Sequence, residues 1–135
     1  MELVDCTKEY WEFVRTLRND KRVLDGFIES THITPEMQIN YMNKYSHCYR
    51  IAVNEAHSGD TLVKFPIGFV GVIEDDIRIC THPDWQGNGV GKFMLTEIIK
   101  IFPNAYGKVK INNTASKKLF EKAGFKKRFV IYESS

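Results

Sequence analysis

The sequence predicts one α/β (α+β) domain with the element order βααβββαβαβ. Two observations lead to this order. The first half contains two segments with helical spacing of apolar residues, then three short apolar runs, and the second half alternates helical segments with short strands. The chain has 135 residues, of which 43% are hydrophobic, which is enough for one sizeable core. We therefore expect residues 1–135 to form a single domain.

The first half is predicted to begin with a short strand, Glu2–Asp5, and to continue with two helices. Thr7 is a suitable cap for the first helix, which ends near Asn19 and has apolar residues at helical spacing, namely Tyr10, Trp11, Val14 and Leu17. The second helix should end near Tyr45. Its start is marked by a capping residue, a proline suited to the first turn and an early acid, which are Thr34, Pro35 and Glu36.

Three strands should follow the second helix as an antiparallel meander. The apolar runs at 49–53 and 67–72 flank a cluster of turn-forming residues at 57–60. Asp75-Asp76 separates the second run from the third, which covers 77–81.

A broad apolar helical face follows Gly91 and is ended by Pro103. Residues 108–111 are predicted to be a short strand. Asn113 or Thr114 then opens a helix that Gly124 closes as a left-handed cap, so that Phe125 packs back on Phe120. The last strand is predicted at 128–132.

Composition excludes several classes of protein. The formal charge of +2 is too small for a nucleic-acid-binding surface, and the N-terminus has no basic region followed by an apolar run. No apolar stretch approaches the roughly eighteen residues of a membrane span. Three cysteines without C-x-x-C spacing indicate neither a disulfide framework nor a zinc site. We expect a soluble cytoplasmic protein with reduced thiols, no metal, no nucleic acid and no membrane partner.

Three glycines at alternate positions, Gly87, Gly89 and Gly91, precede the predicted third helix. They permit tight turns, remove side chains from the approach and present N–H groups at a helix start, where the dipole also favours an anion. The expected ligand is therefore a phosphate or pyrophosphate. The spacing is not that of a nucleotide-triphosphate loop, since Gln86 and Phe93 occupy positions that need Gly and Ser or Thr. It is not the G-x-G-x-x-G dinucleotide pattern either.

Two motifs resemble the GCN5-related N-acetyltransferases (GNAT). Gln86-x-x-Gly89-x-Gly91, after a strand and before an amphipathic helix, is similar to the acetyl-CoA signature Q/R-x-x-G-x-G/A of that family. Asn113-x-x-Ser-x-x-Leu-Phe-Glu-Lys-x-Gly-Phe is similar to its fourth-helix motif. The resemblance covers residues 68–125 well and the first sixty by element order. It implies a mixed, mostly antiparallel central sheet with helices on both faces, splayed between its fourth and fifth strands.

The resemblance also implies how acetyl-CoA binds. The pyrophosphate would lie on backbone amides of the loop, with the cofactor-binding residues Gln86, Gly87, Asn88, Gly89, Val90, Gly91 and Lys92. The backbone near Thr81 would pair with pantetheine, Asn113 would reach it, and Phe120 would lie beside the thioester sulfur. Asn113 can serve as a helix cap at the same time. Lys92, Lys117 and Lys118 are either additional charges for the phosphates or ordinary solvated lysines on a helix face.

The expected activity is that of an acyltransferase, in which an amine attacks the thioester of acetyl-CoA directly in a ternary complex. The acceptor would be a primary amine of a small molecule, such as an amino sugar, or a protein N-terminus. Such an amine has a pKa of about 10 and must lose a proton, so a base is required. The candidates are Glu74, Asp76 and His82, with a Cys80–His82 thiol–imidazole pair as a covalent alternative. Family members often have a tyrosine as the acid at the position of Phe120, and phenylalanine has no proton to give.

The acceptor is expected near the first two helices and the loop between them, where Arg18, Arg22, Phe27, Gln38 and Tyr41 form a mixed charged and aromatic surface. A solvated loop is the alternative interpretation of these charges. Two functions stay open at this point: an N-acetyltransferase, and a non-catalytic acyl-CoA-binding module suggested by Phe120. We also predict a homodimer that covers the edge of the last strand, against a monomer whose edge is kept solvated by Lys126, Lys127 and Arg128.

Overall fold

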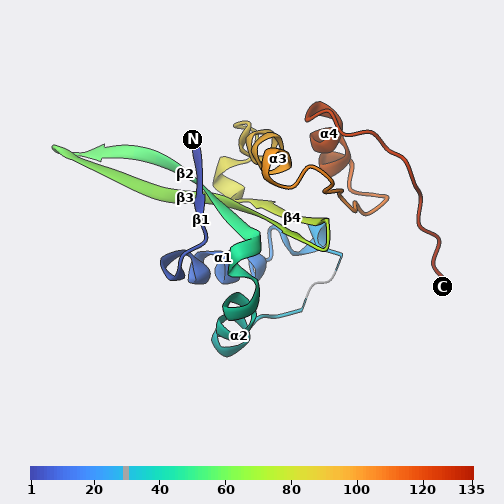
Figure 1. The fold of residues 1–135 in the computed structure, drawn as a ribbon, viewed down its shortest axis with the longest axis horizontal. Coiled ribbons are helices and arrows are strands. Elements are labelled where there is room, and N and C mark those ends of the chain that lie inside the picture. Colours follow the sequence, from blue (N-terminus) through green and yellow to red (C-terminus); the bar gives the residue numbers. More distant parts are fainter. Residues whose placement is uncertain (29–30) are drawn as a thin grey trace.

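The computed structural model describes residues 1–28 and 31–135, which form a central sheet with two helices on each face (Figure 1). On one face lie α1 (Trp11–Arg18) and α2 (Pro35–Tyr45). On the other lie α3 (Val90–Ile101) and α4 (Thr114–Lys122). Short 3₁₀ turns connect several of these elements: η1 (Lys8–Tyr10), η2 (Leu24–Gly26), η3 (Ser46–Cys48) and η4 (Pro83–Trp85). The predicted fold class, with helices on both faces of a mostly antiparallel sheet, is confirmed.

The sheet has four antiparallel strands in the order β1-β2-β3-β4. They are β1 (Glu2–Asp5), β2 (Tyr49–Ser58), β3 (Thr61–Ile73) and β4 (Asp76–Thr81). β2 and β3 are longer than predicted, and their outer parts form a hairpin that projects from the body (Figure 1). Apolar periodicity marked only the buried parts of the two strands, because the projecting parts are exposed and are held by the ladder of backbone hydrogen bonds.

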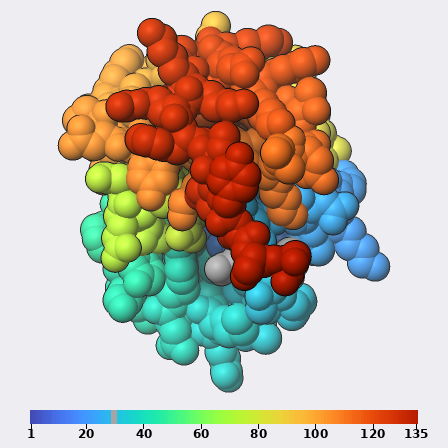
Figure 2. Space-filling model, turned by 90° about the vertical axis from the view of Figure 1, so that its right-hand side faces the viewer, coloured from blue at the N-terminus to red at the C-terminus, as the bar shows by residue number. Residues whose placement is uncertain are grey.

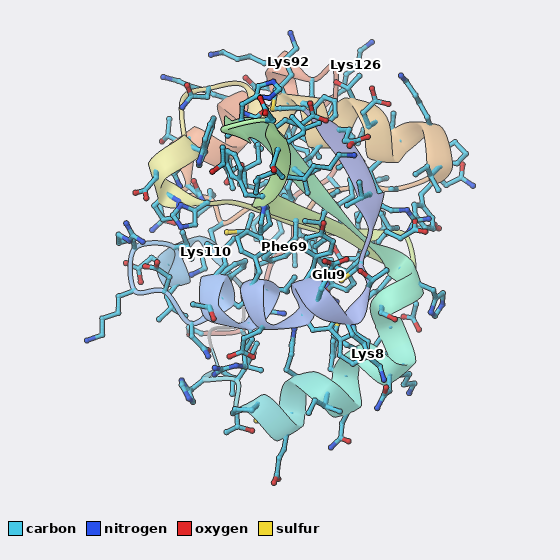
Figure 3. The ribbon with its side chains drawn as sticks, turned by 90° about the vertical axis from the view of Figure 1, so that its left-hand side faces the viewer. Lys8, Glu9, Phe69, Lys92, Lys110 and Lys126 are labelled. Carbon is cyan, nitrogen blue, oxygen red and sulfur yellow. The ribbon has the colours of Figure 1, made fainter. Side chains whose placement is uncertain are left out.

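Two apolar clusters fill the space on either side of the sheet. Phe69 points from β3 toward α1 (Figure 3) and belongs to the cluster beneath α1 and α2. Tyr49 of β2 lies in the same cluster, and its ring covers Gly71, where a Cβ atom would meet the ring at 2.6 Å. The second cluster joins the opposite face of the sheet to α3 and includes the fully buried Met94 and Ile98. Each face therefore has its own core, and β4 contributes side chains to both.

The boundaries of α2 and α4 agree closely with the sequence prediction, whereas the cap predicted at Thr7 is wrong: α1 begins at Trp11, and Thr7 precedes η1 without a side-chain capping hydrogen bond. The Met37 N–H donates to Thr34 Oγ1, which caps α2 as predicted. Asn113 caps α4, since its Oδ1 accepts from the Ser116 N–H at 3.0 Å. Gly124 has φ +91°, and the Phe120 and Phe125 rings pack edge to face at 5.2 Å. None of the helices in the described ranges is long and apolar enough to cross a membrane.

The predicted strand at 108–111 is wrong. After α3 the chain pairs with β4 at a single parallel bridge, where the Ile77 N–H donates to the Tyr106 oxygen at 2.9 Å and the Tyr106 N–H donates to the Asp75 oxygen at 2.8 Å. The chain then diverges from β4. An extended segment without a neighbour has no ladder to join, so residues 108–111 are irregular although their sequence suits a strand.

The predicted strand at 128–132 is also wrong. The segment alternates apolar residues as expected, but it stands off from the body beyond α4 (Figure 1) and passes in front of the side seen in Figure 2. Phe129 and Tyr132 are 83% and 93% exposed. The alternation identifies a segment able to pair, whereas pairing needs a partner strand that the described chain does not place beside it. The homodimer proposed to cover this region stays a prediction.

Candidate functional site

The glycine loop between β4 and α3 is open on its outer side. After η4, Gly87 and Gly89 adopt φ values of +83° and +78°, which glycine reaches without a steric penalty. A Cβ atom at either position would meet nothing within 4 Å. Asn88 shapes the turn, because its side-chain amide donates to the Trp85 and Gln86 oxygens at 3.2 and 3.3 Å. The glycines are therefore required by the backbone conformation and leave room for a ligand.

The start of α3 presents backbone donors to this open side. The first hydrogen bond of the helix runs from the Phe93 N–H to the Gly89 oxygen at 3.0 Å. The backbone N–H groups from Gly89 to Lys92 therefore have no acceptor within the helix and are available to bind a ligand. The first turn contains no acid, and Val90 anchors it in the core at 1% exposure. Lys92 is exposed on the α3–α4 side of the molecule (Figure 3). The helix dipole, the amides and this lysine together favour an anion at the loop.

One edge of β4 is available for pairing next to the loop. The backbone N–H and C=O groups of Arg78 and Cys80 point toward β3, and the His82 N–H donates in the same direction, to the Ile67 oxygen. The Ile77 N–H points outward to Tyr106, so the alternation of a strand also turns the peptide groups of Ile79 and Thr81 outward. Within residues 1–28 and 31–135, no strand pairs with that part of the edge. The edge of β4 is thus open beyond the bridge, but the predicted splay between a fourth and a fifth strand is not formed by the described residues, since an irregular segment takes the place of the fifth strand.

α4 packs closely against two glycines, one in α3 and one in the irregular segment that follows α3. A Cβ atom at Gly91 would lie 2.9 Å from a Leu119 methyl carbon, and one at Gly107 would lie 2.2 Å from the Phe120 ring. The Phe120 side chain is therefore packed at the irregular segment that follows the bridge, and it is half-buried. The Asn113 Nδ2 lies 3.7 Å from the Cβ position of Gly26, which places η2 beside the start of α4.

The acidic candidates for the base lie at the far end of β4 from the glycine loop. Glu74 is exposed in the β3–β4 turn, where it has φ +51°. Asp76 is more enclosed, with an 18% exposed side chain that forms ion pairs with Arg78 Nε at 3.4 Å and with Lys108 Nζ at 3.8 Å. The sheet therefore separates Glu74 and Asp76 from His82 by the length of β4.

His82 and Cys80 do not form the thiol–imidazole pair considered from the sequence. The Asp84 N–H donates to His82 Nδ1 at 3.1 Å, which occupies the lone pair of the neutral imidazole. The Cys80 thiol instead faces the Thr81 carbonyl at 3.7 Å. Burial raises the pKa of Cys80 to about 12, with the Arg18 charge opposing the shift, so the thiol stays protonated near neutral pH.

The acceptor residues named from the sequence are partly brought together. Arg18, Gln38 and Tyr41 line one cavity of about 110 Å³ between α1, α2 and the sheet. Phe27 stacks on Arg18, whose Cζ lies 5.1 Å from the ring centroid. Arg22 lies outside this cavity and pairs with Asp20 at 2.7 Å, which holds the pKa of Asp20 down at about 2.

Sequence reasoning missed two residues of this region. Tyr49 lines the cavity, and its hydroxyl lies 2.7 Å from that of Tyr41. Burial raises the pKa values of both tyrosines, and the nearby positive charge of Arg78 opposes part of this shift. Arg78 could have been found from the alternation of side chains along β4, which puts it on the same face of the strand as Asp76 and Cys80.

Comparison with known proteins agrees with this geometry. Residues 60–127, about half of the chain, match the family described as "Acetyltransferase (GNAT) domain". The chain therefore belongs to the GNAT acetyltransferase family. A search of curated protein sequences finds no match.

Three solved structures share the fold at low sequence identity. Spermidine N-acetyltransferase from Vibrio cholerae in complex with CoA and spermine is 20% identical, with a TM-score of 0.75 over 95% of this chain and 82% of that one. Ribosomal-protein-alanine N-acetyltransferase from Brucella melitensis is 14% identical, with a TM-score of 0.70 over 93% and 85%. AAC(6')-Iy in complex with the bisubstrate analogue CoA-S-monomethyl-acetylneamine is 17% identical, with a TM-score of 0.64 over 99% and 97%.

Replacing Gly89 with valine is expected to weaken acetyl-CoA binding by at least about 10-fold, because the new side chain occupies the open face of the loop. Isothermal titration calorimetry measures the affinity. Gly59→Val is the matched control, since Gly59 also has a positive φ of +64° with open space, but lies in the β2–β3 turn. Equal affinity of the two folded variants for acetyl-CoA would contradict the assignment of the loop.

Proposed function

We propose that this chain transfers the acetyl group of acetyl-CoA to a primary amine by direct attack in a ternary complex. The main support is the continuity of two features: the open amides at the start of α3, and the outward peptide groups of Ile79 and Thr81 on the adjoining edge of β4. The first suits a pyrophosphate, and the second suits the amides of a pantetheine arm. The amine acceptor is a small molecule, such as an amino sugar, or a protein N-terminus.

The carry-over from the family assigns a role to each part of this surface. The loop residues Gln86 to Lys92 hold the pyrophosphate, and the backbone at Thr81 pairs with pantetheine. We assign the outward Ile79 N–H to the thioester carbonyl oxygen, where it would stabilise the negative charge that develops during attack. Asn113 remains available through Nδ2, because its cap uses only Oδ1. Phe120, beside Gly107, would line the place of the departing sulfur.

The proton of the amine needs an acceptor before or during attack. Asp76 is our preferred candidate among the three, since its side chain is the most enclosed and it lies on the same face of β4 as Cys80, although Arg78 and Lys108 also pair with it. Glu74 would act through water from the exposed turn. His82 is the weakest candidate in this conformation, because Nδ1 is already occupied by the Asp84 N–H. The amine nitrogen bonds to the acetyl carbon, the carbon–sulfur bond breaks, and CoA leaves as the thiolate.

Transfer is tested by the release of free CoA thiol from acetyl-CoA in the presence of a panel of primary amines. The proposal predicts amine-dependent release together with an N-acetylated product seen by mass spectrometry. The alternative function, a non-catalytic acyl-CoA-binding module, is favoured by the absence of a tyrosine at Phe120. It predicts acetyl-CoA binding without amine-dependent release, and that result with every amine in the panel would contradict the proposed transfer.

Phe120→Tyr tests whether the missing acid limits the reaction. A hydroxyl on the ring would supply a proton to the departing thiolate, so the kcat should rise about 10- to 100-fold while the affinity for acetyl-CoA is unchanged. Phe125→Tyr is the control, because it places the hydroxyl on the partner ring of the same aromatic pair. An unchanged kcat in a Phe120→Tyr variant of native stability would show that this position does not face the leaving sulfur.

A further inference from the structure

The cavity between α1, α2 and β2 has an unusual set of polar groups. Its apolar walls are Val14, Ile33, Met37 and Met42, and its polar groups come from Arg18, Gln38, Tyr41 and Tyr49. None of the described residues that line the cavity carries a carboxylate. The volume of about 110 Å³ is enough for several waters or for one small group of a ligand.

Three of the polar side chains are held by one another or by the backbone. The Gln38 Nε2 donates to the Trp11 oxygen at 2.7 Å, which fixes the amide although Gln38 is only 3% exposed. The Tyr41 and Tyr49 hydroxyls lie 2.7 Å apart, so one donates to the other and one proton remains available. Burial raises the pKa of both tyrosines, which keeps them protonated as donors.

Arg18 differs from these side chains. Its Nε is buried and has no hydrogen-bond partner among the described residues. Three other arginines near the same face each have a carboxylate, since Arg15 pairs with Glu12, Arg22 with Asp20 and Arg78 with Asp76. Phe27 covers the Arg18 guanidinium by stacking, which supplies no acceptor. The Arg18 side chain is only partly buried, so its guanidinium is accessible, and its Nε–H donor, unused among the described residues, could engage a ligand oxyanion.

The position of Arg18 relates this charge to the proposed reaction. Arg18 ends α1 and contributes to the pKa values of Cys80 on β4 and of the tyrosine pair. Cys80 precedes Thr81, whose outward peptide groups lie on the edge proposed to bind pantetheine. Cys80 also belongs to the apolar cluster that contains the cavity-lining Val14, Met42 and Tyr49. The cavity therefore lies on the face of β4 that carries Arg78 and Asp76. A group bound by Arg18 would belong to the acceptor rather than to the phosphates at the start of α3.

We propose that Arg18 binds an oxyanion of the acceptor, so that the substrates are amines that also carry a carboxylate or phosphate. The guanidinium forms paired hydrogen bonds with either group, and the spare tyrosine proton adds a third donor. A polyamine such as spermine, bound by the Vibrio cholerae neighbour, would bring positive charge to a cavity that already holds Arg18 and lies near Arg78. This inference rests on the proposed acetyl transfer and narrows its substrate class.

The test compares each acid with its uncharged counterpart. Glycine, β-alanine and γ-aminobutyrate separate amine and carboxylate by increasing lengths, and each is assayed against its primary amide. Glucosamine 6-phosphate against glucosamine tests phosphate as the source of the anion, and spermidine tests a polycation. For at least one pair, the anionic member is expected to have a kcat/KM about 10- to 100-fold above that of its neutral counterpart. The pair with the larger ratio of kcat/KM values shows whether the site prefers a carboxylate or a phosphate.

Two substitutions connect that preference to Arg18. Arg18→Gln should reduce the preference to about 1-fold, and Arg18→Lys, which keeps the charge without the planar fork, should retain part of it. Arg128→Gln makes the same change in net charge on the exposed C-terminal segment and should leave the preference intact. Circular dichroism and urea midpoints establish that each variant is folded.

Binding of the N-acetylated products, measured by calorimetry, keeps this inference separate from catalysis. If the protein binds the N-acetylated acid better than its amide through Arg18 but transfers acetyl to no amine, the proposed function fails and the anion site stands. Equal kcat/KM and equal product affinity within every pair would overturn the anion site. So would faster acetylation of spermidine than of every anionic amine, or a preference unchanged by Arg18→Gln.

Discussion

The candidate site depends on one feature of the hydrogen-bonded sheet: β4 is paired along one edge and released along the other. β3 fixes the inner edge through six residue pairs. On the outer edge, the backbone that follows α3 pairs with β4 at Tyr106, and no further backbone pairing to that edge is found among the described residues. The peptide groups of Ile79 and Thr81 are left facing outward, and the same strand leads directly into the glycine loop. A continued fifth strand would occupy those groups and close the surface on which a ligand arm can pair.

Close packing holds the two walls of this opening in place. Glycine at positions 91 and 107 lets Leu119 and Phe120 of α4 approach the chain more closely than any larger residue would allow. On the other face, the buried Tyr49 ring over Gly71 supports the cavity below α1 and α2. The anion-favouring amides lie on one face of the sheet, and Arg18, which has no carboxylate partner among residues 1–28 and 31–135, lies on the other. This arrangement suits a reaction between two separately bound molecules.

Much of the fold and the backbone geometry of the glycine loop could be predicted from the sequence, because their signals are local. The cap at Thr34, the left-handed Gly124 and the spacing of Gly87 to Gly91 each depend on a few neighbouring residues. The strands at 108–111 and 128–132 could not be judged in this way, since a strand exists only beside a partner distant in the sequence. The contact between Tyr41 and Tyr49 spans only eight residues, but it depends on how α2 packs against β2 and is therefore not visible in the sequence pattern. Arg18, Gln38 and Tyr41 were predicted to lie in one acceptor region, whereas the lack of a carboxylate partner for Arg18 within the described part of the chain required coordinates.

The central claim, that one ligand occupies both the loop and the open edge of β4, is tested most directly by backbone amide chemical shifts during titration with acetyl-CoA. The account predicts large shifts for the amides from Gly87 to Lys92 and for Ile79 and Thr81, with the distant turn at Gly59 unchanged. Shifts confined to the loop would show that the edge of β4 does not pair with the ligand. Saturable binding that leaves both groups of amides unchanged would contradict the account as a whole.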